Sequence, residues 1–256
     1  MTQSDKARLF ATLHVKGAPL LLYNVWDAGS ARAVAAAGAR AIASSSWAVA
    51  GAQGYGDGEA LPFELLVTIH ARIVAATDLP VSADCESGYA VEPEAVAANV
   101  ARLIEIGIVG INFEDQRLPE GGMFAVGEQC ERIRAVRRRA DAMGVPLFIN
   151  ARSDLFLQAP DAAAHRGLLP AAKERAEAYR EAGASGLFVP GLVDEELLAD
   201  LCASVALPVN VMMMGEATPA VSRLSALGVA RVSYGGLPFA LYSRALEERA
   251  RLALRA

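Results

Sequence analysis

Acidic side chains stand at the ends of several short apolar segments, where their spacing predicts a metal site. Asp84 and Glu86 are two positions apart at the end of one segment, so their side chains share a face of a β-strand. Glu114 ends the next such segment. Clustered carboxylates raise one another's pKa unless a cation neutralises them. A small hard ion, Mg²⁺ or alternatively Mn²⁺, suits such oxygen ligands, and these three carboxylates are its predicted ligands.

Arg152 is a single cation among these acids, at the end of another apolar segment. A guanidinium group can hold a carboxylate or a phosphonate through two parallel hydrogen bonds. Arg152 is therefore a predicted substrate-binding and catalytic residue. The structural alternative is an ion pair with Glu114 or Asp154, just as Asp84 and Glu86 could cap a helix or pair with arginine. A binding role and an ion pair can coexist.

Small polar residues and a glycine-rich loop complete the candidate site. Hydroxyl and N–H groups at Ser45, Ser46 and Trp47 could bind an anionic oxygen, although ordinary packing at a strand end explains the same run. The segment Gly54–Gly58 is no nucleotide-binding loop, because the third glycine of that fingerprint is missing and no Lys-Ser or Lys-Thr follows. We interpret it as a flexible loop that presents Asp57 over the site.

The elements that must position these residues are short apolar strands alternating with longer helices. Parallel strands buried on both faces are apolar on both sides of their alternation, and such segments recur here about every 30 residues, the size of a βα unit. Strands are predicted at Leu20–Val25, Ala41–Ser46, Pro80–Asp84, Val109–Glu114, Pro146–Arg152, Gly186–Pro190, Pro208–Met212 and Ala230–Tyr234. Helices are predicted at Ala28–Ala37, Pro62–Thr77, Glu92–Ile106, Gly127–Met143, Pro170–Ala182, Asp194–Ala206, Thr218–Leu227 and Phe239–Leu254, with an extra helix within Met1–Gly17.

Eight such units predict an α/β fold, either a (β/α)8 TIM-type barrel or a long doubly wound sheet. The missing nucleotide fingerprint favours the barrel. No linker-like change of composition divides the chain, so residues 1–256 are predicted to form a single (β/α)8 barrel domain. In a barrel, side chains at the carboxyl ends of the strands meet at one rim. Asn210, on the seventh strand, joins the carboxylates there as a predicted substrate-binding residue.

Composition excludes several classes of protein. Of the 256 residues, 54% are hydrophobic and 21% are charged, which is too apolar for a disordered chain. The net charge is −5 with no basic stripe, so no nucleic-acid partner is expected. No apolar run reaches the roughly 18 residues of a membrane span, and the N-terminus has no signal-peptide pattern. Three scattered cysteines argue against a disulfide framework and indicate a reducing, cytoplasmic location.

Several of these segments together resemble the isocitrate lyase/phosphoenolpyruvate mutase superfamily. The resemblance extends from about Leu9 to Tyr242. Its most specific parts are the acidic third-strand motif followed by Gly-Tyr and the Glu-Asp pair that ends the fourth strand. These parts identify the superfamily and not one reaction. The matching segments are Asn24–Asp27, Ser82–Tyr89, Gly110–Asp115 and Asn150–Asp154, and Phe188–Gly191 and Pro208–Val211 fit the later strands.

The resemblance implies a barrel whose last helix is swapped between subunits of a homodimer or homotetramer. It implies Mg²⁺ held by Asp84, with Glu86 and Glu114 acting partly through water. A 2-oxo acid or related carboxylate would be bound by the metal, by Arg152 and by the stretch from Ser45 to Trp47. Asp57 matches the loop aspartate near the reacting centre. The predicted catalytic residues are therefore Asp57, Arg152 and Glu114, and Asp84 is also a predicted substrate-binding residue. Substrates of this kind react through an enolate-like state.

The segment after the fourth strand departs from the superfamily pattern. Lyase members carry a lid with a Lys-Arg/Lys-Cys-Gly-His motif, but residues 116–124 contain neither Cys nor His. Mutases and phosphonopyruvate hydrolases have an Asn where Gly122 stands and a His where Pro190 stands. Three hypotheses follow. The first is a Mg²⁺-dependent lyase that cleaves or decarboxylates a small 2-oxo or 2-hydroxy (di)carboxylic acid. The others are a phosphonomutase or phosphonopyruvate hydrolase and a non-catalytic 2-oxo acid binding protein.

Overall fold

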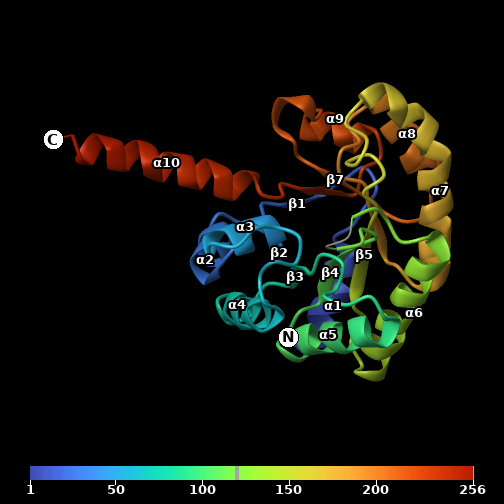
Figure 1. Ribbon diagram of the computed structural model, residues 1–256, viewed down its shortest axis with the longest axis horizontal. Coiled ribbons are helices and arrows are strands. Elements are labelled where there is room, and N and C mark those ends of the chain that lie inside the picture. The colour runs from blue at the N-terminus through green and yellow to red at the C-terminus, as the bar shows by residue number, and fades with distance from the viewer. Residues whose placement is uncertain (119–120, 256) are drawn as a thin grey trace.

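Eight short parallel strands form one sheet that curls into a nearly closed barrel in the computed structural model, which describes residues 1–118 and 121–255 (Figure 1). Hydrogen-bonded neighbours follow the order β1-β8-β7-β6-β5-β4-β3-β2, and a parallel bridge between Val25 and Ser44 joins the two ends. The predicted (β/α)8 barrel is confirmed. The strands are β1 Leu20–Leu22, β2 Ile42–Ala43, β3 Val81–Asp84, β4 Gly110–Glu114, β5 Phe148–Arg152, β6 Gly186–Phe188, β7 Val209–Met212 and β8 Arg231–Ser233.

Helices occupy the segments between the strands, and several begin or end where the sequence supplies a cap. Asp27 accepts a hydrogen bond from the Ser30 N–H at 2.7 Å and caps the start of α2. Gly183 ends α7 at φ 105°, a conformation that favours glycine. The helices are α1 Gln3–Thr12, α2 Ala28–Ala36, α3 Ser46–Ala52, α4 Phe63–Ala75, α5 Pro93–Glu105, α6 Val126–Ala142, α7 His165–Ala182, α8 Glu195–Ser204, α9 Val221–Ala226 and α10 Leu237–Ala253, with 3-10 turns η1 Ala162–Ala164 and η2 Gly215–Ala217.

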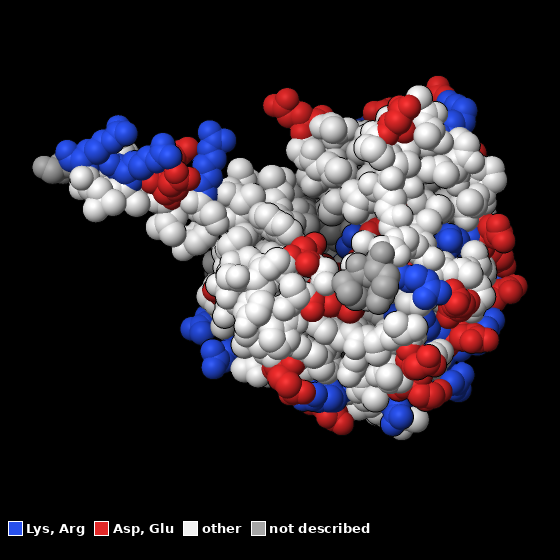
Figure 2. All heavy atoms as spheres, in the orientation of Figure 1, with Lys and Arg blue, Asp and Glu red and all other residues white. Residues whose placement is uncertain are grey.

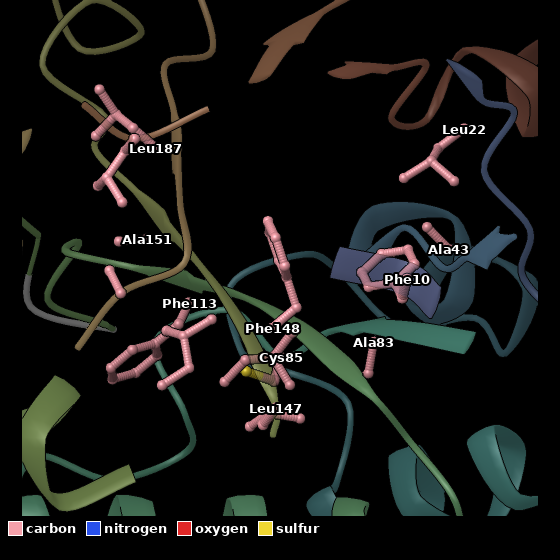
Figure 3. Close-up of a cluster of buried hydrophobic side chains, with 14 of the residues drawn as sticks. Phe10, Leu22, Ala43, Ala83, Cys85, Phe113, Leu147, Phe148, Ala151 and Leu187 are labelled. Carbon is pink, nitrogen blue, oxygen red and sulfur yellow. The ribbon is translucent and has the colours of Figure 1, made fainter. Parts of the chain in front are cut away.

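The extra helix α1 closes the amino-terminal end of the barrel. Phe10 packs edge-on against Phe148 at the start of β5, with ring centroids 5.5 Å apart. A side chain on Gly110, the first residue of β4, would lie 2.6 Å from the Phe10 ring, so only glycine leaves room for it. Phe10 and Phe148 belong to the cluster of buried hydrophobic side chains drawn in Figure 3. The opposite end of the barrel is therefore the end open to a ligand.

Most predicted boundaries differ from the structure by one to three residues, and two differences alter the assignment of an element. The second strand ends at Ala43, and Ser46 already begins α3, a helix that the sequence analysis did not predict. Helix α7 begins at His165 rather than at Pro170, which lies inside it. His165 is therefore part of a helix, where its Nε2 lies 2.8 Å from the Ala159 carbonyl oxygen.

The last helix, α10, extends away from the barrel instead of packing on it (Figure 1). Aromatic contacts hold its first turns, since Phe239 packs against Trp26 and Trp47 at 5.2 and 5.8 Å. Beyond Tyr242 its side chains are exposed to solvent. Within the described residues, no helix is both long enough and apolar enough to cross a membrane.

Candidate functional site

A cavity of about 390 Å³ lies at the carboxyl ends of the strands, and acidic side chains gather around the hollow on this face (Figure 2). Larger hollows of about 490 and 590 Å³ lie elsewhere, on the outside of β1 and α2, and each is lined by one charged side chain, Arg40 or Asp27, rather than by a cluster of them. We therefore place the candidate site in the smaller cavity. It is lined by Asn24, Ser45, Ser46, Trp47, Asp57, Asp84, Asn112, Arg152, Leu157, Phe188, Met212, Ser233, Gly235, Gly236, Leu237 and Ala240.

Asp84 ends β3 and is held against the start of α3. Its Oδ2 accepts hydrogen bonds from the N–H and the hydroxyl of Ser46, both at 3.0 Å. Its own N–H donates to Ser44 Oγ at 2.8 Å, and Ser44 Oγ lies 2.8 Å from the Nε2 of buried His70. Its other oxygen, Oδ1, is buried and has no hydrogen-bond partner among the described residues. One oxygen is thus fixed by the protein, and the other is left for a ligand.

Arg152 sits at the end of β5 between two carboxylates. Its NH1 lies 2.9 Å from Glu114 Oε2, and its Nε and NH2 donate to the two Asp154 oxygens at 2.6 and 2.9 Å. Burial alone would lower the pKa of Arg152, but the charges of Glu114 and Asp154 raise it, so the guanidinium stays ionised. Burial raises the pKa of Glu114, and Arg152 opposes that rise. Arg152 makes the ion pairs foreseen as its structural role and also lines the cavity.

The loop that carries Asp57 is fastened to the loop after β3. The Glu59 N–H donates to Glu86 Oε2 at 2.7 Å, and the Tyr89 N–H donates to Glu59 Oε1 at 2.7 Å. Glu59, Glu86 and Tyr89 all have positive φ, at 60°, 51° and 57°. Such backbone is costly for residues other than glycine and persists where the surroundings impose it. These bonds hold Asp57 at the cavity, as the sequence predicted.

The carboxylates perturb one another. Burial, followed by the charges of Asp57 and Asp84, raises the pKa of Glu86 to about 8. Burial and the charge of Asp84 likewise raise the pKa of Asp57. An excess of buried negative charge is the condition that a bound cation relieves. Glu86 and Glu114 are buried beside the cavity but are not among the residues that line it.

The carboxylates fit a Mg²⁺ site with one direct protein ligand and several waters better than a site formed entirely by protein ligands. No three His, Cys, Asp or Glu side chains of the described residues are arranged to hold a metal directly. The unpartnered Asp84 Oδ1 is a ready inner ligand, and Mg²⁺ usually keeps several waters. Glu86 and Glu114 would then contribute through those waters.

A polar network forms the floor of the cavity. Asn112 Oδ1 accepts from Asn150 Nδ2 at 2.9 Å and from Arg231 NH2 at 3.0 Å. Arg231 Nε also donates to Ser233 Oγ at 3.1 Å, and Asn210 Nδ2 lies 3.2 Å from the same oxygen. The structure does not bring Asn210 to the cavity, because its side chain lies level with Arg231, below Ser233. Asn210 supports a lining residue and does not line the cavity itself.

The segment after β4 forms a small antiparallel turn, with a bridge between Gln116 and Met123. Arg117 NH2 donates to Glu128 at 2.7 Å, and its guanidinium lies 4.3 Å from the Phe124 ring centre. Residues 119 and 120 of the predicted lid region lie outside the described part of the chain. The basic residue of this segment is therefore engaged away from the cavity.

Sequence reasoning missed four polar residues of the site: Asn24, Asn112, Arg231 and Ser233. Asn24 Oδ1 accepts from the N–H groups of Tyr234 and Gly235 at 2.9 Å and ties β1 to the loop after β8. A signal was present for Arg231, since a charged residue in a strand buried on both faces is rarely there without a specific partner.

Comparisons with known proteins agree on one family. A sequence profile described as phosphoenolpyruvate phosphomutase matches residues 10–254. A crystal structure from Burkholderia cenocepacia J2315, provisionally assigned as a phosphonomutase, is 46% identical, covers 99% of both chains and superposes with a TM-score of 0.93. The 2-methylisocitrate lyase of Escherichia coli (strain K12) is 29% identical over 96% of this chain and 84% of its own. Phosphonopyruvate hydrolase in complex with oxalate and Mg²⁺ is 20% identical over 98% of this chain and 87% of its own, with a TM-score of 0.84, and shares the fold.

Proposed function

Because the chain belongs to the phosphoenolpyruvate phosphomutase family, whose relatives are lyases and mutases, we propose that it is a Mg²⁺-dependent lyase of small 2-oxo or 2-hydroxy carboxylic acids. It would break a C–C bond, by cleavage or decarboxylation, through an enolate-like intermediate. The observation that carries this proposal is the unpartnered oxygen of Asp84 in the same cavity as the ionised Arg152. The same cavity thereby offers an oxygen that can bind a cation and a guanidinium that can bind a carboxylate.

Each residue has a distinct proposed role. Bound Mg²⁺ would supply electrostatic stabilisation of negative charge on a substrate oxygen. Asp84 would hold the ion directly, and Glu86 and Glu114 would hold its waters. Arg152 would bind the substrate carboxylate, with Glu114 and Asp154 fixing its orientation. The N–H groups at the start of α3, near Ser45, Ser46 and Trp47, would bind another anionic oxygen.

Asp57 is the proposed proton carrier. The segment 116–124 contains neither Cys nor His, and Asp57 is an acidic side chain that lines the cavity with a raised pKa. A carboxyl group whose pKa is shifted toward neutrality can donate and accept protons under physiological conditions. The family resemblance, which implies a loop aspartate near the reacting centre, also supports this role.

We also propose a homodimer or homotetramer in which α10 is exchanged, and a cytoplasmic location. The three cysteines are free and buried, which fits a reducing compartment. The exposed α10 and the hollow outside β1 support the exchange.

Calorimetry with oxalate, a stable mimic of the 2-oxo acid head, tests the site. Oxalate should bind in the presence of Mg²⁺ and lose most of its affinity when Mg²⁺ is chelated. Asp84→Asn keeps the shape of the side chain and removes its charge, so the Mg²⁺-dependent part of the affinity should fall at least about 100-fold. Undiminished binding by Asp84→Asn would contradict the metal assignment.

Product analysis separates the candidate reactions. Release of pyruvate or glyoxylate from hydroxy acids, or of CO₂ from oxaloacetate, supports the lyase. Release of phosphate from phosphonopyruvate would instead assign phosphonate chemistry, the second candidate, which the 46% identical structure favours. Tight Mg²⁺-dependent binding without any product would identify a binding protein.

A further inference from the structure

We infer, building on the proposed function, that the substrate is a 4-hydroxy-2-oxo monocarboxylic acid whose far end is an uncharged, apolar chain. Cleavage of its C3–C4 bond leaves the electron pair on the enolate of pyruvate, and the C4 hydroxyl proton passes to Asp57 as the aldehyde forms. The cavity has two chemically different sides. Its polar side comes from the ends of β2 to β5 and carries the serines, Asp84, Asn112 and Arg152. Its other side, here called the apolar wall, consists of Leu157, Phe188, Met212 and Leu237.

The apolar wall is contributed by neighbouring elements. Leu157 follows β5, Phe188 ends β6, Met212 ends β7 and Leu237 begins α10 after β8. β5, β6 and β7 are consecutive in the sheet, so Leu157, Phe188 and Met212 lie side by side opposite β2 and β3, while Ser233 of β8 separates Met212 from Leu237. Arg152 adjoins this wall, since its guanidinium carbon lies 5.9 Å from the Phe188 ring centre, so the chain of a substrate whose carboxylate lies on Arg152 can extend along it. Apolar surface stabilises a hydrocarbon group and offers nothing to a charged one.

The charges around the cavity lead to the same result. Among the residues that the structure describes, Arg152 is the one basic side chain in the lining, facing Asp57 and Asp84. Arg152 already balances Glu114 and Asp154. Arg117, the nearest basic residue of the segment after β4, is paired with Glu128. A second carboxylate or a phosphonate would lie against the wall without a cation, which is costly in a partly desolvated site.

A matched pair of ligands tests this inference. 2-Oxoglutarate and 5-methyl-2-oxohexanoate share the 2-oxo acid head, and two methyl groups of the second replace the terminal carboxylate oxygens of the first. Calorimetry with saturating Mg²⁺ should show the apolar ligand binding at least about 10-fold more tightly. In a series of straight-chain 2-oxo acids, each added methylene should raise the affinity about 2- to 4-fold until the wall is covered.

A charge placed on the wall should reverse the preference. Leu157 is 38% exposed at the rim, so Arg can be accommodated there. Leu157→Arg should bind 2-oxoglutarate about 10-fold more tightly than the wild type does and the apolar ligand more weakly. Leu157→Met, which keeps the wall apolar, should retain the wild-type order.

The outcomes separate the two proposals. If oxalate fails to bind with Mg²⁺, the proposed function fails and the inference falls with it. If oxalate binds but 2-oxoglutarate binds as tightly as its apolar counterpart, the proposed function stands and the inference is wrong. A folded Leu157→Arg protein with an unchanged ligand order would also overturn it, because the chain of the substrate would then not lie on this wall.

Discussion

Arg231 is fully buried, yet no carboxylate of the described residues forms an ion pair with it. Its partners among the described residues are Asn112 and Ser233, and its NH1 has none. Burial lowers the pKa of Arg231 to about 9, while the charge of Asp84 opposes that shift. An arginine can only donate hydrogen bonds, so it forces Asn112 to turn its oxygen inward. The amide nitrogen of Asn112 then faces the cavity as a donor for an anionic ligand.

Replacing Arg231 should separate binding from stability. In Arg231→Met, Asn112 Oδ1 and Ser233 Oγ keep their bonds to Asn150 and Asn210, and a buried charge disappears. We therefore expect an unchanged or higher melting temperature. We also expect an oxalate affinity about 10-fold lower, because Asn112 is then held by one donor, Asn150, instead of two. Calorimetry and thermal unfolding of the same samples provide both measurements.

The coupling of Arg231 with Asn112 provides the control. If Arg231 acts through Asn112, the losses of affinity in Arg231→Met and Asn112→Ala should not add in the double variant. Additive losses, or a loss of stability as large as the loss of affinity, would indicate that Arg231 serves the fold alone.

At the scale of elements, α1 closes the amino-terminal end of the barrel, and the residues after it bring a titratable side chain, His14, into the core. His14, just beyond α1, stacks on Phe148 with ring centroids 3.9 Å apart. Its Nδ1 lies 2.8 Å from the Phe10 carbonyl oxygen, and its buried Nε2 has no partner among the described residues. Burial, and then the charge of Arg231, lowers the pKa of His14 from 6.5 to about 3. The folded barrel therefore requires a neutral imidazole.

Acid should lower the free energy of unfolding through His14. Because the pKa is depressed in the folded state, the unfolded chain binds the extra proton, and stability falls as the pH decreases below 6.5. Between pH 7.5 and 5.0 the contribution of His14 to the free energy of unfolding should drop by about 2 kcal/mol. Urea unfolding of the wild type and of His14→Phe at both pH values measures it. An equal pH dependence in the two proteins would contradict the prediction.

The elements that sequence could predict are those specified by local patterns. The buried strands could be predicted, and so could the extra helix before β1. Helix α3 could not, because the three serines from Ser44 to Ser46 directly follow the apolar residues of β2 and were assigned to the same strand. What starts the helix includes the bonds from Ser46 to Asp84, 38 positions away in the sequence. Asp84 and Arg152 could be predicted because they stand at the ends of strands. The bond from Arg231 to Asn112 could not, because it joins residues far apart in the sequence across the barrel.

At the scale of the whole molecule, the surface outside β1 is left uncovered. In a (β/α)8 barrel the helix after the eighth strand would pack there, but α10 extends away (Figure 1). Leu21, in the middle of β1, is therefore 44% exposed, and the hollow beside it is lined mainly by apolar residues of β1 and α2, with Arg40 and Tyr234. Along α10, four apolar side chains are half exposed or more: Leu241, Tyr242, Leu246 and Leu252. An uncovered groove and an uncovered apolar helix on one chain are complementary.

Two copies that exchange α10 would cover each other's exposed apolar surfaces, since a two-fold axis brings each helix to the groove of the other copy. Light scattering should show a dimer or a higher even assembly. Leu246→Glu places a charge on the apolar face of α10 and should shift the population toward monomer, as should Leu21→Glu in the groove. Arg249→Glu changes the charge of an exposed position and should leave the assembly intact. A wild-type protein that stays monomeric at micromolar concentrations would show that α10 has no such partner.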